Sequence, residues 1–410
     1  MTETARLPAA VWLTQGEVAQ LLALLNRDGE EARVVGGAVR NALLGLAVGE
    51  IDVATTAVPD EVSRRVEAAG WKAVPTGIEH GTVTAVIQGK PFEVTTLRQD
   101  VETYGRKAKV VFGRDWVADA NRRDFTINGL SAAADGMVHD YVGGLADIAT
   151  RRVRFIGDAA TRITEDYLRI LRFFRFHAWY GEGALDVAGL HACIGARAGL
   201  DMLSRERVRM EMLKLFLAPH ATRVLAVMAE AGILGSVLGG VPLLASFENT
   251  AKVEVASATA PDAIRRLGAL AVFLKEDAER LADRLRLSNA ESTRLAALDS
   301  WWRVFPAHGE QDVRALLYRA GLQTFTDRVL VAWSRSPSGA ADAAWLELAR
   351  LPQRWTVPVF PLKAADFMRR GIAAGPIMGA ALRTAEEAWI AADFPSDQTL
   401  IDAIADKAAQ

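Results

Sequence analysis

The chain has 410 residues, 50% of them hydrophobic and 24% charged, which is too long for one ordinary core and predicts two to four domains of ~100–200 residues each. Lys and Arg number 48 against 50 Asp and Glu, so no global basic field is available to hold a polyanion. The single cysteine, Cys193, excludes a disulfide framework and a cysteine-based zinc site. Since no targeting segment and no run of ~18 apolar residues is visible, we expect a cytoplasmic protein without membrane contact.

Two kinds of sequence meet near residue 160. Before it, short β-branched runs alternate with turns, and Thr82–Gln88 and Pro91–Thr96, joined through Gly89 and Lys90, have the pattern of a β-hairpin. After it, apolar residues recur at helical spacing almost throughout, with little strand signal. The sequence therefore predicts an α+β fold, in which a mixed N-terminal part is followed by an all-α remainder.

The first stretch that carries chemistry joins a glycine turn to a pair of acids. A β-branched run leads into Gly36 and Gly37 and then into a helix that carries Arg40, so backbone N–H groups at the turn can face phosphates. Glu50 and Asp52 follow on a predicted short strand, where a period of two places both carboxylates on one face. Such a pair can share Mg²⁺, which polarises the phosphate in nucleotidyl transfer. An ordinary turn beside a solvated strand face is the competing interpretation.

Three further polar features lie between residues 93 and 124. Glu93 is in the second strand of the predicted hairpin and reaches the same metals if that strand adjoins Glu50–Val53; an exposed strand glutamate is the alternative. Residues 98–120 are polar, basic and glycine-bearing, which predicts a mobile loop or an ordinary solvated connection. Arg123 and Asp124 then precede an apolar strand, where Arg123 can meet a triphosphate and Asp124 a ribose hydroxyl.

The most specific stretch is Thr164–Phe176, in which arginines recur every third residue. Thr164 is the expected N-cap of a helix whose first-turn acids suit the helix dipole. Arg169, Arg172 and Arg175 alternate with bulky apolar residues, so they lie in a cleft or along a seam between packed surfaces. Because an isolated buried cation is costly, we expect anionic or hydrogen-bonding groups to meet them.

Taken together and in order, these motifs resemble the signatures of the class II tRNA nucleotidyltransferases, the CCA-adding enzymes, and of the similar bacterial poly(A) polymerases. The motifs are GGAVRN, EID, RRDFTINGL, DYVGGLADI and EDYLRILRFFRF, and the likeness spans roughly residues 33–217. The resemblance implies a polymerase-β-like nucleotidyltransferase head at residues 1–160 and a helical neck for base recognition at 161–220. It also implies a helical body at 221–335 and a helical, tRNA-binding tail at 336–410.

The same resemblance implies a role for each site residue. Glu50 and Asp52 hold the catalytic metal, Mg²⁺, while Asp166 and Arg169 face the nucleotide base, with Arg172 and Arg175 nearby. Contacts to the triphosphate are implied for four residues, namely Gly36, Gly37, Arg40 and Arg123. The family usually has Asp where this chain has Asn41 and Glu50, and the longer Glu50 side chain makes its assignment weaker than that of Asp52.

Hydrogen-bond polarity supports this interpretation of Asp166 and Arg169. Cytosine and adenine both present an amino donor beside a ring-nitrogen acceptor, which match a carboxylate and a guanidinium respectively. Uracil and guanine present the reverse pattern, and a site built from hydrogen-bonding partners can reject such analogues by ~10⁴–10⁵. The pair therefore predicts a protein template that selects CTP and ATP.

The leading hypothesis from the sequence is template-independent addition of CCA to tRNA 3′ ends, with release of diphosphate. A poly(A) polymerase is the nearest alternative, and an enzyme that adds only CC is another, although such enzymes tend to have a shortened 98–120 segment. From a different class, a catalytically silent RNA-binding relative is disfavoured by the intact acid pair. A fused phosphohydrolase is rejected, because the His-Asp pair that it needs occurs only at His139 and Asp140, within the DYVGG segment.

Overall fold

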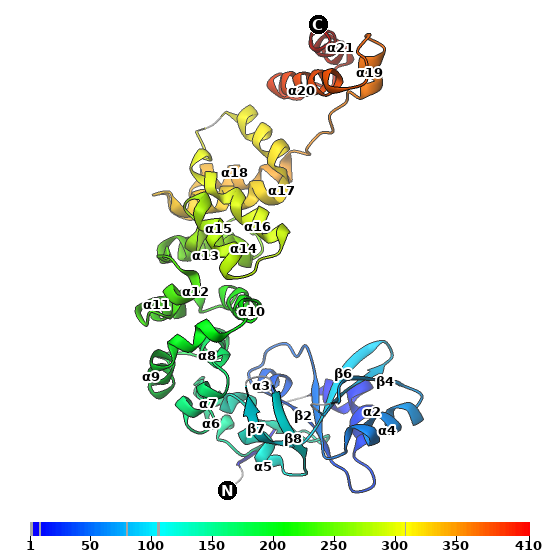
Figure 1. The fold of residues 1–410 in the computed structure, drawn as a ribbon, viewed down its shortest axis with the longest axis vertical. Helices are drawn as coiled ribbons and strands as arrows, with labels where there is room; N and C mark the ends of the chain where they lie inside the picture. Colours follow the sequence, from blue (N-terminus) through cyan, green and yellow to red (C-terminus); the bar gives the residue numbers. More distant parts are fainter. Residues whose placement is uncertain (1–2, 8–9, 79–80, 105–106, 308) are drawn as a thin grey trace. The chain divides into compact units, whose positions relative to one another are not determined.

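The computed structural model describes residues 3–7, 10–78, 81–104, 107–307 and 309–410. The chain divides into two compact units, Met1–Val237 and Leu238–Gln410 (Figure 1). The predicted α+β fold is confirmed, since the strands lie in the first unit and the second is helical. Over the described ranges, no helix is long and apolar enough to cross a membrane. The four-part division into head, neck, body and tail stays a prediction.

An eight-stranded sheet forms the centre of the head. The pairing of β3 with β6 is parallel, and the other ladders are antiparallel. In spatial order the strands are β1 (Glu3–Arg6), β10 (Met137–Asp140), β9 (Ser131–Ala132), β2 (Ala32–Val35), β3 (Asp52–Thr55), β6 (Lys90–Thr96), β5 (Thr82–Ile87) and β4 (Lys72–Gly77).

The predicted hairpin is confirmed as β5 and β6, with a small correction to its turn. Ile87 pairs with Lys90, so the two turn residues are Gln88 and Gly89 and not Gly89 and Lys90. Both have positive φ, 51° and 82°, as a type I′ turn requires. The hairpin places β6 against β3, the strand that begins with Asp52.

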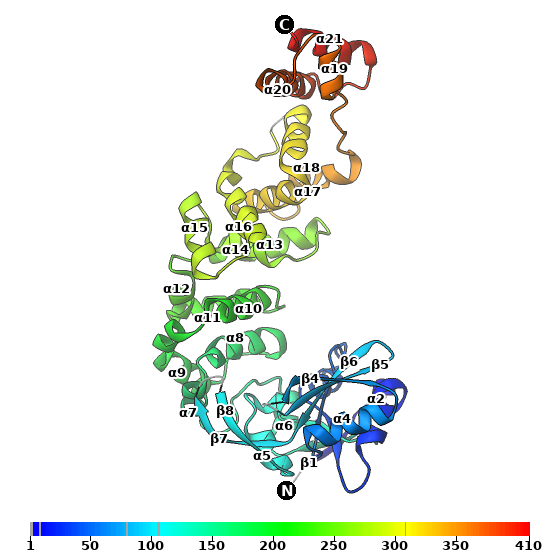
Figure 2. The same cartoon turned by 45° about the vertical axis from the view of Figure 1, so that its right-hand side comes forward.

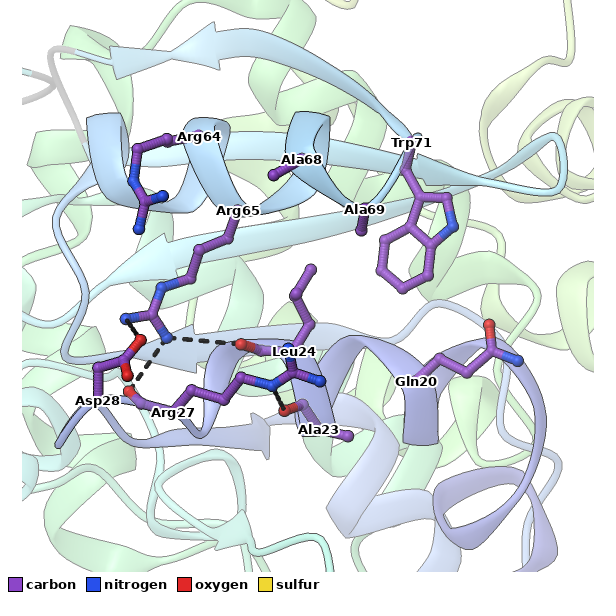
Figure 3. A pocket seen from close by; sticks show the side chains of 10 residues that line it. All are labelled: Gln20, Ala23, Leu24, Arg27, Asp28, Arg64, Arg65, Ala68, Ala69 and Trp71. Atoms are coloured by element: carbon purple, nitrogen blue, oxygen red, sulfur yellow. Dashed lines mark hydrogen bonds and ion pairs between the residues drawn. The ribbon is translucent and has the colours of Figure 1, made fainter.

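Two helices, α2 (Gly16–Leu25) and α4 (Pro59–Ala68), lie side by side in the head (Figures 1 and 2). A hollow of about 530 Å³ separates them, and no residue of the predicted site lines it (Figure 3). The buried Arg65 donates hydrogen bonds to the carbonyl oxygens of Leu25 (3.2 Å) and Arg27 (3.1 Å) at the end of α2. This arginine therefore satisfies carbonyls that the helix terminus would leave unpaired.

Residues 98–120 are not the predicted loop. Arg98–Tyr104 (β7) and Lys107–Phe112 (β8) pair as a two-stranded antiparallel ribbon, and Trp116–Asn121 form helix α5. Residues 105–106 lie outside the described residues. After the ribbon, Arg114 donates to the Glu30 carboxylate at 2.7 Å, which ties the segment to the turn before β2. Pairing between the two strands stabilises this segment, whereas its composition alone suggested a loop.

Helices of the predicted neck follow the head sheet within the first unit. Helix α8 (Leu168–Tyr180) packs against α10 (Arg205–Phe216) and α11 (Ala221–Glu230) (Figure 2). Phe173 and Phe176 from α8 contact the ring of Phe125, with centroids 6.3 and 5.1 Å apart. The remaining helices of this region are α7 (Ala159–Glu165), α9 (Val187–Gly195), η3 (Arg197–Met202) and α12 (Ile233–Leu238).

The second unit is built from helices, and its described residues include several apolar clusters. One cluster includes Trp333 and Trp345, whose rings stack 6.2 Å apart, and another is centred on the buried Phe367. The helices are α13 (Leu244–Ala256), α14 (Ala263–Ala271), α15 (Lys275–Arg284), α16 (Asn289–Ala296), η4 (Ala297–Arg303), α17 (Glu310–Arg335), α18 (Ala343–Arg354), α19 (Ala364–Met368), α20 (Pro376–Ala391) and α21 (Gln398–Ala408).

Candidate active site

The sheet brings two of the predicted acids together. Asp52, the first residue of β3, is in register with Glu93 on the parallel strand β6 and with Val35 at the end of β2. Neighbouring residues in register share a face of the sheet, so the condition on which the assignment of Glu93 depended, that its strand adjoins β3, is met. Glu50 lies before β3, so the prediction that it belongs to this strand is wrong. That its carboxylate shares a face with Asp52 stays a prediction, and its charge does act on Asp52.

Asp52 is the electrostatic focus of these acids. Its side chain keeps contact with solvent, yet the atoms around it remove enough water to raise its pKa, and the negative charges of Glu93 and Glu50 raise the pKa further. Arg123 opposes this shift. A cation that binds such a cluster stabilises it, because the positive charge offsets the repulsion between the ionised carboxylates.

The donor set fits Mg²⁺ in its chemistry. Asp52, Glu93 and Glu50 offer carboxylate oxygens, and Mg²⁺ is usually held by one or two carboxylates together with water and substrate phosphates. Within the described ranges, no group of three or more His, Cys, Asp or Glu side chains is arranged to hold a metal by itself.

The glycine turn lies at the same edge of the sheet. Gly36 follows Val35, the residue opposite Asp52, and has φ +67° where α3 (Gly37–Leu43) begins. A Cβ placed on Gly36 would lie 3.3 Å from Nη1 of Arg123, so the turn and this guanidinium are immediate neighbours. A side chain at this position would be strained by its backbone conformation and crowded by the arginine.

Arg123 is held in place by a buried acid. Its Nη2 lies 3.0 Å from Oδ2 of Asp119 on α5, whose other oxygen pairs with Arg122. Burial alone would raise the pKa of Asp119, but the two arginines lower it. A fixed guanidinium beside a glycine turn and a carboxylate cluster is suited to binding a phosphate group.

Arg40 is a buried arginine beside the glycine turn. Its guanidinium donates hydrogen bonds to Asn41, Asn128 and the hydroxyl of Tyr180, the last at 2.8 Å. Its Nη2 would lie 3.6 Å from a Cβ on Gly37. Arg40 thus borders the glycine turn, while its hydrogen bonds are made to protein.

Asp124 is likewise occupied by protein groups. Oδ2 accepts from Nε of Arg172 at 2.8 Å, and Oδ1 accepts from the Phe125 amide at 2.9 Å and from Asn128 at 3.0 Å. Burial would raise the pKa of Asp124, but Arg172 and the other donors lower it. The predicted ribose contact stays a prediction, and the observed role is to hold Arg172.

The predicted base-reading pair lies at the junction of α7 and α8. Oδ1 of Asp166 accepts from the Leu168 amide at 3.1 Å, and Oδ2 accepts from Nη2 of Arg207 at 2.6 Å. Arg169 donates to the carboxylate of Glu165, whose pKa burial would raise and the nearby arginines lower. Both members of the pair are partly exposed and are oriented by a charged neighbour.

The expectation that anionic groups meet the arginine series is confirmed. Arg172 pairs with Asp124, and Nε of Arg175 lies 2.5 Å from Oε2 of the buried Glu211 on α10. The guanidinium of Arg175 also lies 4.4 Å from the ring centroid of Phe176. The series therefore follows a seam between α8 and its neighbours, as the interleaved apolar residues predicted.

Two local predictions around these residues are wrong. Thr164 lies inside α7 and bonds the carbonyl of Thr161, so it caps no helix. Thr126–Asn128, expected as a strand, form a short 3₁₀ helix, η2. Sequence reasoning also assigned no role to Asn128, Tyr180, Arg207 or Glu211, since each acts through a partner remote in the sequence.

A sheet edge that joins paired acids to a glycine turn, followed by an arginine-lined helix, defines a nucleotidyltransferase. The family described as the poly A polymerase head domain matches residues 32–154, and the one described as a probable RNA and SrmB-binding site of polymerase A matches residues 191–247. The CCA tRNA nucleotidyltransferase 1, mitochondrial, of Mus musculus is 34% identical over 381 residues, which cover 90% of this chain and 85% of the relative.

Two further comparisons agree. The CCA-adding enzyme of Limosilactobacillus fermentum is 31% identical over 93% of this chain and 94% of its own length. The crystal structure of the Bacillus stearothermophilus CCA-adding enzyme in complex with CTP superposes with a TM-score of 0.75 at 27% identity, over 95% of this chain and 96% of that one. The chain belongs to the CCA tRNA nucleotidyltransferase family, and it is a nucleotidyltransferase.

Proposed function

We propose that the protein adds CCA to the 3′ end of tRNA from CTP and ATP, without a nucleic-acid template and with release of diphosphate. The observation that carries the proposal is that a carboxylate and a guanidinium, those of Asp166 and Arg169, lie within one turn of each other at the junction of α7 and α8, in the same compact unit as the acids of the sheet. Each is oriented by a charged neighbour, Arg207 for Asp166 and Glu165 for Arg169. Relatives named as CCA-adding enzymes, and the likeness to one solved with CTP, support the same assignment.

Asp52 and Glu93, with Glu50 alongside, would hold the catalytic Mg²⁺. When bound, the metal polarises the transferred phosphate and favours ionisation of the attacking hydroxyl. The chain's own part is to hold Asp52 where burial and the charges of Glu93 and Glu50 raise its pKa, so that a cation would be favoured there. Glu50 lies in the segment before β3, and its charge acts on Asp52, so its longer side chain would take the place of the shorter acid usual in the family.

The glycine turn and Arg123 would receive the triphosphate. The Gly36 N–H already donates to the Leu130 carbonyl at 3.1 Å, so the backbone donor at the turn would be Gly37, at the start of α3. Arg123 adds a charge fixed by Asp119. Arg40 supports the turn from within the protein, since it is buried beside Gly37. These contacts would hold the reacting phosphate near the acids, and such positioning accelerates phosphoryl transfer.

Base selection would come from Asp166 and Arg169, with Arg172 and Arg175 fixing the helix that presents them. Asp166 accepts from the amino group of cytosine or adenine, and Arg169 donates to the adjacent ring nitrogen. Uracil and guanine would set a carbonyl against the carboxylate. Arg207 and Glu165 hold the two side chains before a nucleotide binds, so the template is preorganised.

One observation favours a second candidate, a poly(A) polymerase, because the head matches a family described by that activity. Incubating the purified protein with each labelled NTP and either tRNA that lacks CCA or an unstructured RNA primer separates the two. CCA addition confined to tRNA supports the proposal, and extended A tails on both substrates contradict it. Addition that stops after two cytidines would identify a CC-only enzyme.

The base-reading role of Asp166 is tested by Asp166→Ala, with Asp201→Ala, an exposed aspartate of η3, as the matched control. We expect Asp166→Ala to relax the rejection of UTP and GTP, because their carbonyls no longer face a carboxylate. Incorporation of all four NTPs is measured beside a thermal melt. An unchanged preference for CTP and ATP in Asp166→Ala would remove this residue from base selection.

A further inference from the structure

A buried amide, Asn128 in η2, joins two groups of the candidate site. Its Oδ1 accepts a hydrogen bond from Nη1 of Arg40 at 2.6 Å, and its Nδ2 donates to Oδ1 of Asp124 at 3.0 Å. Only 8% of the residue is exposed. These partners fix the orientation of the amide, since a guanidinium can only donate and an ionised carboxylate can only accept.

On one side, Asn128 reaches the glycine turn through Arg40. The guanidinium of Arg40 borders Gly37, with 3.6 Å between Nη2 and a Cβ placed there. It also donates to the Tyr180 hydroxyl at 2.8 Å and lies 3.8 Å from the centroid of the Tyr180 ring. Arg40 is thus clamped between the turn and the last residue of α8.

On the other side, Asn128 reaches α8 through Asp124. Oδ2 of Asp124 pairs with Nη2 of Arg172 at 2.7 Å, and Nη1 of Arg172 lies 3.6 Å from Oε1 of Glu211. The guanidinium carbons of Arg40 and Arg172 lie 5.3 and 5.2 Å from the ring centroid of Phe176. The two branches therefore meet the same helix, α8.

We propose that Asn128 is a positioning residue that holds the base-reading helix α8 in register with the glycine turn. The inference rests on the proposed function, because it assigns the register to nucleotide selection. An amide suits this position because its oxygen accepts from the guanidinium while its nitrogen donates to the carboxylate. Aspartate would place a second negative charge against Asp124, and leucine would satisfy neither neighbour.

The consequence for the reaction is geometric. The turn holds the triphosphate and α8 presents Asp166 and Arg169, so an error in their register misplaces the base whenever the phosphates are correctly bound. Misplacement by about 1 Å can cost ~10²-fold in a positioned reaction. Asn128 thereby makes base recognition depend on a contact that touches neither the base nor the phosphates.

The test compares Asn128→Asp and Asn128→Leu with Asn41→Ala in the full-length protein. Asn41 is the matched control, because its Oδ1 accepts from the same Arg40 but its Nδ2 donates to the Ala47 carbonyl and not to Asp124. Equilibrium dissociation constants are measured for CTP, ATP, UTP and inorganic tripolyphosphate with Mg²⁺ and without tRNA. A thermal melt shows whether each variant is folded.

We expect the preference for CTP over UTP to fall at least ~10-fold in both Asn128 variants, while tripolyphosphate affinity changes less than about 3-fold. Asn41→Ala is expected to keep the wild-type preference. Tyr180→Phe, which removes the hydrogen bond that joins Arg40 to α8 and keeps the ring, should lower the preference in the same direction by a smaller factor. This milder variant carries the test if the Asn128 variants do not fold.

The outcomes separate the two levels of inference. A wild-type protein that binds CTP and UTP equally contradicts the proposed base selection and, with it, the register role. A wild-type preference that the folded variants retain within about 3-fold overturns the role of Asn128 alone. Equal losses of preference in Asn128→Leu and Asn41→Ala would show that Arg40 matters without its link to Asp124, and would also overturn the inference.

Discussion

A buried histidine should make the first unit sensitive to mild acid. His177 in α8 is 1% exposed, and neither ring nitrogen has a hydrogen-bond partner within the described part of the chain. Burial lowers the pKa of His177 to about 4, and the positive charges of Arg223 and His220 act in the same direction. The backbone of Gly183 opposes the shift weakly, without a hydrogen bond of normal geometry.

The sign of the effect follows from proton linkage. The folded-state pKa lies below the unfolded value of 6.5, so the unfolded chain takes up a proton first as the pH falls. The contribution of His177 to stability is therefore complete above about pH 6.5 and is lost progressively down to about pH 4. The full loss, ~2.5 pH units at ~1.36 kcal/mol each, is about 3 kcal/mol, and about 2 kcal/mol of it is lost by pH 5.

His177→Leu and His177→Gln remove the titrating group. Each variant is expected to lose about 2 kcal/mol less stability than the wild type between pH 7 and pH 5. Native-state hydrogen exchange read on peptides of α8 is the appropriate measurement, because the second compact unit can unfold separately. His191→Gln, at an exposed position of α9, is the control and should keep the wild-type pH dependence.

The decisive quantity is the change in the free energy of unfolding between pH 7 and pH 5, because either substitution also changes packing, and hence stability, at every pH. If wild type and both His177 variants lose the same free energy between pH 7 and pH 5, the buried imidazole does not titrate as the structure indicates. A loss that disappears in His191→Gln instead would assign the acid sensitivity to the surface.

Three further results are expected. Asp52→Asn should abolish nucleotide transfer while Asp60→Asn, an exposed aspartate of α4, leaves it intact; more than a tenth of the activity in Asp52→Asn would remove that carboxylate from catalysis. Glu254 is fully buried and forms ion pairs with Arg265 (2.6 Å) and Arg266 (2.9 Å). The substitution Glu254→Gln should lower the free energy of unfolding of the second unit, measured in urea, by ~3 kcal/mol; a decrease below ~1 kcal/mol would contradict the structure. Binding of tRNA should weaken at least ~10-fold between about 50 and about 200 mM salt, because each neutralised phosphate releases counterions; a flat titration would argue against phosphate contacts.

Local patterns predicted much of the fold and of the site. The alternation of β-branched residues located β5 and β6. The adjacency of Glu93 to Asp52 was left open by the sequence, and the parallel pairing of β3 with β6 decided it. The interleaving of Arg169, Arg172 and Arg175 with apolar residues indicated a seam. Such inferences succeed because side-chain periodicity is a property of the backbone geometry of a single element.

Failures arose where an element boundary or a remote partner decided the outcome. Glu50 was placed on a strand that begins two residues later, and Thr164 was assigned to the start of a helix when it lies near the end of the one before. The ribbon of 98–112 depends on pairing between two segments whose composition alone suggested a loop. Boundaries are weakly encoded because caps and ends respond to their tertiary surroundings.

The sequence by itself determined which side chains carry charge and which helix presents them, because residue type and periodicity are local. Only the tertiary structure decided which acid or hydroxyl meets each arginine. Asp124 and Arg172 are 48 positions apart, Asp166 and Arg207 are 41 apart, and Arg40 and Tyr180 are 140 apart. A buried guanidinium needs a partner, but any of several acids would satisfy that need, and the packing of α3, α8 and α10 selects among them.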